Sequence, residues 1–277
     1  MFHQPHTLAE ALRLRSDLGS AVTVINGGTD VVVAMNHGDL RPAQFLDLSR
    51  VDELRTIERD NGTVLMGAGV TFAQLGKLHW RGLREASLSV AGPAIRSRAT
   101  IGGNIVSASP AGDGAVVLVA LGAEVELTSA DRGPRWLPLR DFFVAYRQTA
   151  LAGDELVTRF RVPWNPMSRW YKIGKRGAVN ISIVCCCVAR NPDGSYGIAL
   201  GCVAPFPVAA WRAEALLGES ELTPVLIEQA GQIVSEEVSP IDDQRGSADY
   251  RRAMCAVLAR RLLRSLASGD GKGDADA

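Results

Sequence analysis

The chain lacks the charge imbalance and the long apolar runs that would indicate several common classes of protein. Its 277 residues include 30 basic and 30 acidic side chains, so no global positive field exists to attract nucleic acid or anionic lipid. No apolar run approaches the roughly 20 residues that a membrane helix needs. The first residues also lack the basic region and apolar core of a secretory signal. We therefore expect a cytoplasmic protein that binds neither nucleic acid nor a membrane.

Cysteine and histidine are few, and their spacing does not indicate a metal site. Three of the five cysteines are consecutive, in the apolar segment NISIVCCCVAR (180–190), which predicts a buried strand. Adjacent strand residues point to opposite faces, so these thiols cannot converge on one ion. No CxxC, HxxxH or HExxH spacing occurs. We interpret the cysteines as small buried hydrophobic residues rather than as metal ligands or a disulfide.

The usual phosphate-binding and nucleophile signatures are missing as well. The pattern GxxxxGK[ST] does not occur, and GAGVTF (67–72) begins like GxGxxG but lacks the third glycine. No Ser–His–Asp set, Cys–His set or carboxylate pair can be identified. The sequence therefore predicts no catalytic constellation, and any site must depend on other features.

Hydrophobic periodicity predicts a mixture of helices and strands, which indicates the α+β class. Thr7 and Glu10 form a predicted capping box for a helix that ends at Gly19. Thr71 and Gln74 predict a second box, for a helix to about Trp80. The further expected elements are strands at 21–26, 44–49, 63–69 and 155–163, a helix at 83–91, an antiparallel meander after Pro166, and two closing helices from Pro224 and at 249–267. The segment VVVAM (31–35) stays ambiguous between strand and helix.

What the chain does have is two Gly-Gly elbows, seventy-five residues apart. They are VINGGTDVVVAM (24–35) and ATIGGNIVSASPAGDG (99–114). Glycine permits positive φ and close approach of a ligand to the backbone, and successive exposed amides form an anion-binding concavity. Thr29, Thr100 and Asn104 add short polar side chains. The elbows are either plain turns or, acting together, a grip for the pyrophosphate of a dinucleotide.

Six segments in order resemble one family: GGTDVVVAM, GAGVTFAQL, TIGGNIVSASPAGD, LGAEVEL, DELVTRFRVP and YKIGKR. The chain resembles the FAD-binding medium subunits of the molybdenum hydroxylases, such as xanthine dehydrogenase, carbon monoxide dehydrogenase and aldehyde oxidoreductase. The likeness spans about residues 1–265, TIGGNIVSASPAGD is its most specific part, and the form of the first segments is closest to bacterial xanthine (purine) dehydrogenase-type subunits.

This resemblance implies a fold and a set of boundaries. It implies an FAD-binding domain of the PCMH/vanillyl-alcohol-oxidase-like type over 1–165, made of two subdomains at about 1–55 and 56–165. A small α+β C-terminal domain would follow at 166–267. The polar segment 268–277 would be a disordered tail.

The resemblance also implies a cofactor site without catalytic or metal-binding residues of its own. Both elbows would wrap the FAD pyrophosphate, Asp113 would lie toward the ribose and adenine, Leu156 and Val157 would lie near the isoalloxazine ring, and Lys172 would lie beside the flavin. Asn180 departs from the family, where aspartate is usual. The residues assigned to FAD in this way are Ile25, Asn26, Gly27, Gly28, Thr29, Asp30, Val31, Thr100, Ile101, Gly102, Gly103, Asn104, Ala108, Asp113, Leu156, Val157 and Lys172.

The implied activity is electron transfer within an oxidoreductase complex. A large molybdopterin-binding subunit and a small subunit with [2Fe–2S] clusters would be the partners, in a dimer of heterotrimers. Electrons would pass from the nearer cluster to FAD, and from there to NAD⁺ or another acceptor. Two alternatives stay open at this point: a stand-alone flavin oxidase, and a phosphate-ligand scaffold that has lost FAD.

Overall fold

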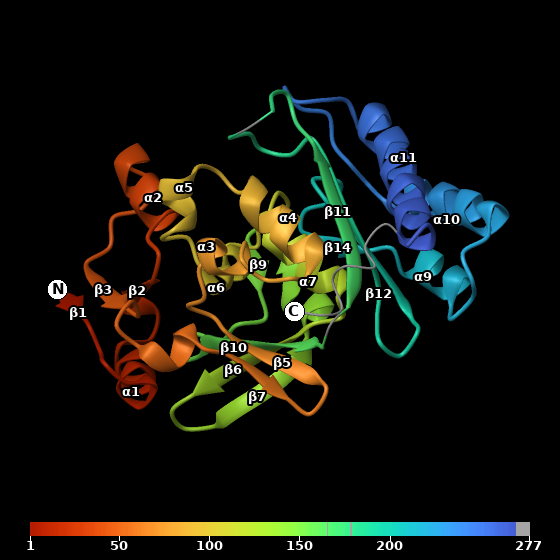
Figure 1. Ribbon diagram of the computed structural model, residues 1–277. Helices are drawn as coiled ribbons and strands as arrows, with labels where there is room; N and C mark the ends of the chain where they lie inside the picture. The colour runs from red at the N-terminus through yellow and green to blue at the C-terminus, as the bar shows by residue number, and fades with distance from the viewer. Residues whose placement is uncertain (165, 178, 270–277) are drawn as a thin grey trace.

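The computed structural model describes residues 1–164, 166–177 and 179–269, and it has three parts along the chain (Figure 1). A small sheet with two helices forms the N-terminal part, a five-stranded sheet with several short helices forms the middle, and a four-stranded sheet backed by long helices forms the C-terminal part. The predicted α+β class is confirmed. Among the described helices, none is both long enough and apolar enough to cross a bilayer.

The N-terminal part is built around a parallel sheet with strand order β1-β3-β2. Thr7 begins its first helix as predicted, because its side chain accepts a hydrogen bond from the Glu10 amide at 3.2 Å. The Glu10 carboxylate accepts a hydrogen bond from the His6 amide rather than from the Thr7 amide. The second hydrogen bond of the predicted capping box is therefore wrong by one residue. The ambiguous segment 31–35 is helical. The elements are β1 (Phe2–His3), α1 (Leu8–Leu18), a 3-10 turn (Gly19–Ala21), β2 (Val22–Ile25), α2 (Val31–His37), β3 (Gln44–Asp47) and a second 3-10 turn (Asp52–Arg55).

The middle part is an antiparallel sheet with order β4-β5-β10-β6-β7, in which β10 returns from later in the chain to the centre. The Thr71–Gln74 capping box is confirmed, but its helix α3 is only four residues long. Helix α7 is buried on all sides, so it forms the core of this part. The strands are β4 (Ile57–Asp60), β5 (Thr63–Gly67), β6 (Glu124–Ser129), β7 (Gly133–Pro138), β8 (Phe143–Ala145), β9 (Gln148–Thr149) and β10 (Leu156–Pro163). The helices are α3 (Phe72–Leu75), α4 (Arg81–Ser89), α5 (Pro93–Arg96), α6 (Ile101–Val106), α7 (Asp113–Ala120) and α8 (Leu139–Phe142).

The C-terminal part confirms the predicted antiparallel meander, with strand order β11-β12-β13-β14. The two predicted closing helices are also present, and α10 begins at Pro224 with Thr223 as its cap. A short helix, α9, was not predicted. The elements are β11 (Met167–Ile173), β12 (Val184–Arg190), β13 (Tyr196–Gly201), β14 (Val208–Ala209), α9 (Trp211–Leu217), α10 (Pro224–Glu237) and α11 (Ala248–Ala267). Of the predicted disordered tail, residues 270–277 lie outside the described residues.

The cysteine strand is β12, which lies between β11 and β13 in the sheet. All five cysteines are buried and free of disulfides, so their interpretation as buried hydrophobic residues agrees with the structure. Burial raises the pKa of the Cys186 and Cys187 thiols, which disfavours the reactive thiolate. Within the described ranges, no group of three or more histidine, cysteine or acidic side chains could hold a metal ion.

Candidate functional site

A large cavity of about 1160 Å³ is lined by residues from all three parts of the molecule. The N-terminal part contributes Arg15, the end of β2 and the segment up to Val31, while the middle part contributes the start of α6 and the segment before α7. The C-terminal part contributes Lys172, Lys175, Arg176, Val179, Asn180, Ile181, Ser182 and Arg245. This volume exceeds the range of about 300–1,000 Å³ that is usual for small-ligand pockets. The cavity therefore has room for an extended ligand such as a dinucleotide.

The first elbow connects β2 to α2, and its residues line this cavity. Gly28 has φ +76°, which a residue with a side chain rarely adopts. A Cβ at Gly27 would overlap the carbonyl oxygen of Arg98, so the two elbows pack directly against each other. None of the five backbone amides of residues 27–31 donates a hydrogen bond to an acceptor among the described residues. A row of unpaired amides at a helix start is a site where an anion binds.

The second elbow is different, and the prediction that it forms another nest of free amides is wrong. Gly102 and Gly103 belong to the first turn of α6, which Thr100 caps. The Ile101 amide donates to Val70 and the Gly102 amide to Ala68, each at 2.9 Å. The backbone here is helical, because a threonine cap begins a helix at the position that the glycines alone suggest is a turn.

The glycines of the second elbow serve for close packing and access. A Cβ at Gly102 would lie 2.7 Å from the Ala68 side chain, so only glycine lets α6 approach β5. A Cβ at Gly103 would meet nothing except Thr100 Oγ1 at 3.2 Å, and Gly103 lines the cavity. Asn104 is engaged inside the protein, where its Oδ1 accepts the Ala115 amide at 3.1 Å. The second elbow therefore shapes the cavity wall but contributes few free donors.

Asp113 and Lys172 lie together at the C-terminal side of the cavity. Lys172 Nζ is 2.9 Å from Asp113 Oδ2 and 3.1 Å from the Ser89 carbonyl oxygen. The same carboxylate accepts hydrogen bonds from Ser182 Oγ at 3.0 Å and Ser89 Oγ at 3.2 Å. The expectation that Asp113 lies toward the adenosine and Lys172 beside the flavin stays a prediction, and the structure adds that the two side chains form one ion pair.

Two of the predicted site residues do not line the cavity. Ile101 is fully buried in the core, and Ala108 is 1% exposed with φ +42°. Their side chains are unavailable to a ligand in this cavity. The predicted residues that do line it are Ile25, Asn26, Gly27, Gly28, Thr29, Asp30, Val31, Thr100, Gly102, Gly103, Asn104, Asp113, Leu156, Val157 and Lys172.

The sequence interpretation missed several polar residues of the cavity wall. Six lining side chains are cationic, namely Arg15, Arg147, Lys172, Lys175, Arg176 and Arg245, whereas only Asp30, Asp113 and Glu155 are acidic. Asp113 is paired with Lys172, and Glu155 accepts hydrogen bonds from Arg135, which lies outside the wall. The surplus of positive charge favours an anionic ligand. Nothing in the local sequence marks these residues, because they come from four separated segments.

Asn180 stands at the C-terminal side of the cavity, next to the same ion pair. Its backbone carbonyl accepts a hydrogen bond from Lys172 Nζ at 3.4 Å, and its side-chain amide donates to the Arg176 carbonyl. Its Oδ1 is shielded from solvent and has no partner in the part of the chain that the structure describes. The amide thus places no negative charge at a position where the family resemblance expects one.

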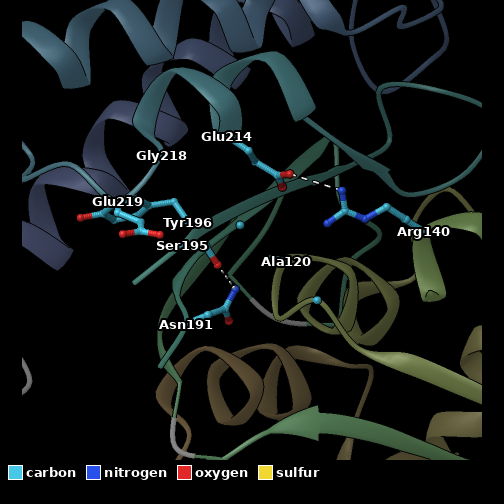
Figure 2. A pocket seen from close by; sticks show the side chains of 10 residues that line it. Ala120, Arg140, Asn191, Ser195, Tyr196, Glu214, Gly218 and Glu219 are labelled. Carbon is cyan, nitrogen blue, oxygen red and sulfur yellow. Dashed lines mark hydrogen bonds and ion pairs between the residues drawn. The ribbon is translucent and has the colours of Figure 1, made fainter. Parts of the chain in front are cut away.

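A second cavity of about 340 Å³ lies at the seam between α7, α8 and the C-terminal sheet (Figure 2). Arg140 and Glu214 face each other there, with 3.5 Å between Nη1 and Oε2. Glu214 Oε1 also accepts the Ile198 amide at 2.9 Å, and burial raises the pKa of this carboxyl. This cavity is too small for a dinucleotide, and none of the predicted site residues lines it.

The comparisons with known proteins cover nearly the whole chain. Residues 1–165 match the family described as the FAD binding domain in molybdopterin dehydrogenase, and residues 169–266 match the CO dehydrogenase flavoprotein C-terminal domain.

Among individual proteins, the chain is 29% identical to the putative xanthine dehydrogenase FAD-binding subunit of Escherichia coli, over 98% of this chain and 97% of that one. It is 32% identical to the nicotinate dehydrogenase FAD-subunit of Eubacterium barkeri, over 95% and 94%. The solved structure of reconstituted CO dehydrogenase from Oligotropha carboxidovorans superposes with a TM-score of 0.90 at 28% identity, covering 96% of this chain and 97% of the other.

Proposed function

Because the chain belongs to the family of FAD-binding subunits of molybdenum hydroxylases, we propose that it carries electrons within such a complex. In this proposal it takes electrons from the [2Fe–2S] clusters of a partner subunit onto FAD, and from there to NAD⁺ or another acceptor. The chemistry that bound FAD supplies is the acceptance of electrons one at a time and their release as a pair. The protein supplies binding, orientation and electrostatics.

The observation that carries this proposal is the row of unpaired amides at residues 27–31. Five backbone donors belong to residues that line a cavity whose wall has six cations and three carboxylates. This donor set fits a pyrophosphate, which is doubly charged and rich in acceptor oxygens. The cavity is also long enough to touch all three parts of the chain, as a dinucleotide requires.

The residues proposed to hold FAD follow from this arrangement. The first elbow binds the pyrophosphate, and Gly103 leaves the space through which the ligand passes close to α6. Leu156 and Val157 form part of the apolar wall, since both are buried yet line the cavity. Lys172 and Asp113 act as one neutral pair that fixes the C-terminal part against α7.

The proposed partners are a large molybdopterin-binding subunit and a small [2Fe–2S] subunit, in a dimer of heterotrimers. Support comes from the names of the relatives, which are described as FAD-binding subunits or medium chains of dehydrogenases. The described residues also offer no group that could hold an iron–sulfur cluster. Electrons for FAD would therefore come from another polypeptide. A xanthine dehydrogenase-type complex is the proposed assembly.

Copurification followed by anaerobic reduction tests this proposal. The complex should contain two further polypeptides, and its organic substrate should bleach the flavin absorbance, which NAD⁺ or another acceptor then restores. The chain alone with FAD should not respond to the substrate. A chain that oxidises an organic substrate unaided would support the stand-alone oxidase instead, and a chain without affinity for FAD would support the scaffold.

Gly28→Val tests the role of the first elbow, and Gly62→Val is its matched control. Both glycines have a similar left-handed backbone, with φ +76° and +83°, but only Gly28 lines the cavity. We expect both variants to lose a similar amount of stability through backbone strain, and only Gly28→Val to lose FAD. Equal flavin content in the two purified variants would contradict the assignment.

A further inference from the structure

Arg15 stands on the N-terminal wall of the large cavity and is fixed there by the end of its own helix. Its Nη1 donates to the Gly19 carbonyl oxygen at 2.8 Å and to the Val22 carbonyl oxygen at 3.4 Å. Gly19 directly follows α1, and Val22 is the first residue of β2. Two backbone carbonyls therefore hold the guanidinium group in place, and the nearby Asp154 carboxylate adds a favourable charge interaction.

The Nε of Arg15 has no hydrogen-bond partner in the described part of the chain, although it is shielded from solvent. A buried donor without an acceptor is costly, and the cost is higher when the group is charged. Burial also lowers the pKa of Arg15, an effect that Asp154 partly offsets. Because Arg15 lines the cavity, a ligand with an acceptor atom at this point would satisfy the orphaned donor.

The N-terminal wall of the cavity is mostly apolar, and the lining carboxylate Glu155, next to Leu156, is paired with Arg132 and Arg135. The neighbours of Arg15 along the cavity come from β2, from the segment after β3, from the second 3-10 turn and from the start of β10. These lining residues are Val22, Val24, Leu48, Leu54 and Leu156. An apolar wall with one planar guanidinium suits a neutral heteroaromatic ring, since guanidinium groups both stack on rings and donate hydrogen bonds to ring nitrogens.

The first elbow lies between this wall and the C-terminal part of the chain. Val24 precedes Gly27 by only three residues, whereas Lys172, Lys175 and Arg245 approach the cavity from the C-terminal part. Figure 1 shows α1 and β2 on one side of the α6 region and β11 on the other. A dinucleotide held at the first elbow thus has one ring directed toward several cations and the other toward Arg15.

We infer that Arg15 recognises the adenine of FAD and makes the chain select FAD over FMN. The flavin ring, which gains negative charge on reduction, suits the cationic C-terminal side, and adenine, which stays neutral, suits the apolar side. Arg15 Nε–H donates to a ring nitrogen of the adenine. This inference rests on the proposed binding of FAD and adds the residue that discriminates between the two flavin cofactors.

The test compares flavin affinities of the full-length chain after removal of its flavin. The proteins are wild type, Arg15→Met, Arg15→Lys, and Arg13→Met, whose residue lies on the same helix but is exposed. Flavin fluorescence reports the Kd for FAD and for FMN. We expect Arg15→Met to weaken FAD binding about tenfold or more, the usual effect of losing a hydrogen bond to a charged group, without changing FMN binding. Arg15→Lys should recover part of the affinity, and Arg13→Met should behave as wild type.

Competition with ADP and with inorganic pyrophosphate separates a contact to adenine from a contact to phosphate. If Arg15 binds adenine, Arg15→Met weakens competition by ADP and leaves competition by pyrophosphate unchanged. Equal weakening of both competitors, or equal loss of FAD and FMN, would overturn the inference. An unchanged FAD to FMN ratio would overturn it as well. Failure of the wild type to bind FAD at all would instead refute the proposed function.

Discussion

Replacing Lys172 by methionine will leave the Asp113 carboxylate without its cation in a site that water barely reaches. The two side chains are 11% and 7% exposed, and 2.9 Å separates Nζ from Oδ2. Removing one partner of such a pair costs about 3–5 kcal/mol, because the remaining charge stays buried. At about 2–4 °C per kcal/mol for a chain of this size, the melting temperature should fall by about 6–20 °C.

A double-mutant cycle with Asp113→Asn then isolates the pair. The carboxylate keeps the Ser89 and Ser182 hydroxyl donors in the single Lys172→Met variant, so part of its charge stays compensated. Asp113→Asn should cost a similar amount, and the double variant should cost less than the sum of the two, with a coupling of about 1–3 kcal/mol.

Thermal unfolding is measured on the flavin-free form of all four proteins of this cycle, so that loss of cofactor cannot be mistaken for loss of the ion pair. The exposed pair Arg252–Asp249, at 3.1 Å with side chains 43% and 95% exposed, is the control and should show no measurable coupling. Additive effects of Lys172→Met and Asp113→Asn would refute the reasoning, since they would mean that the two groups do not interact in solution.

Three further predictions concern other parts of the chain. Gly103→Val should abolish FAD binding while the apo-protein keeps its melting temperature, since a Cβ at Gly103 would meet only Thr100 Oγ1, at 3.2 Å. Gly92→Val, whose Cβ would meet no atom within 4 Å, should retain the flavin. Retention of flavin by both variants would contradict the placement of α6. Because burial raises the folded-state pKa of Glu214 above the ordinary 4.5, the folded state binds its proton more tightly. The stability of wild type relative to Glu214→Gln should therefore increase as the pH falls through the raised folded-state pKa toward about 4.5. A difference between the denaturation midpoints of the two proteins that does not change with pH would contradict this prediction. All five cysteines are buried, and burial raises the pKa of Cys255 to about 12. A thiol reagent should therefore modify none of them in the native protein and all five after unfolding. Rapid labelling of the native protein would show that the segments carrying these cysteines open.

Local signals in the sequence predicted the helices and strands well wherever a cap or a period was clear. Thr71 with Gln74, and Thr223 before Pro224, each mark a helix start that the structure confirms. The second elbow was misjudged because two glycines suggest a turn, while the Thr100 cap before them begins a helix. Both signals were present in the sequence, and the structure shows which of them determined the backbone.

The candidate site could be predicted only in the part that depends on neighbouring residues. The first elbow is such a part, since Gly27 and Gly28 act through their own backbone. The pairing of Asp113 with Lys172 joins residues fifty-nine positions apart, and Arg15 reaches the cavity only because α1 packs against β3 and β6. No local pattern in the sequence contains these relations, because they arise from tertiary packing.

The cavity has a consequence for the order of events during biosynthesis. Its walls begin at Arg15 and end at Arg245, so nearly nine-tenths of the chain must leave the ribosome before the last wall residue can take its place. A nascent chain that has folded only its first sheet already contains the unpaired amides, but it lacks the cavity wall that the middle and C-terminal parts supply. We therefore expect flavin loading to come late in synthesis, and a protein truncated before Arg245 to be made without bound flavin.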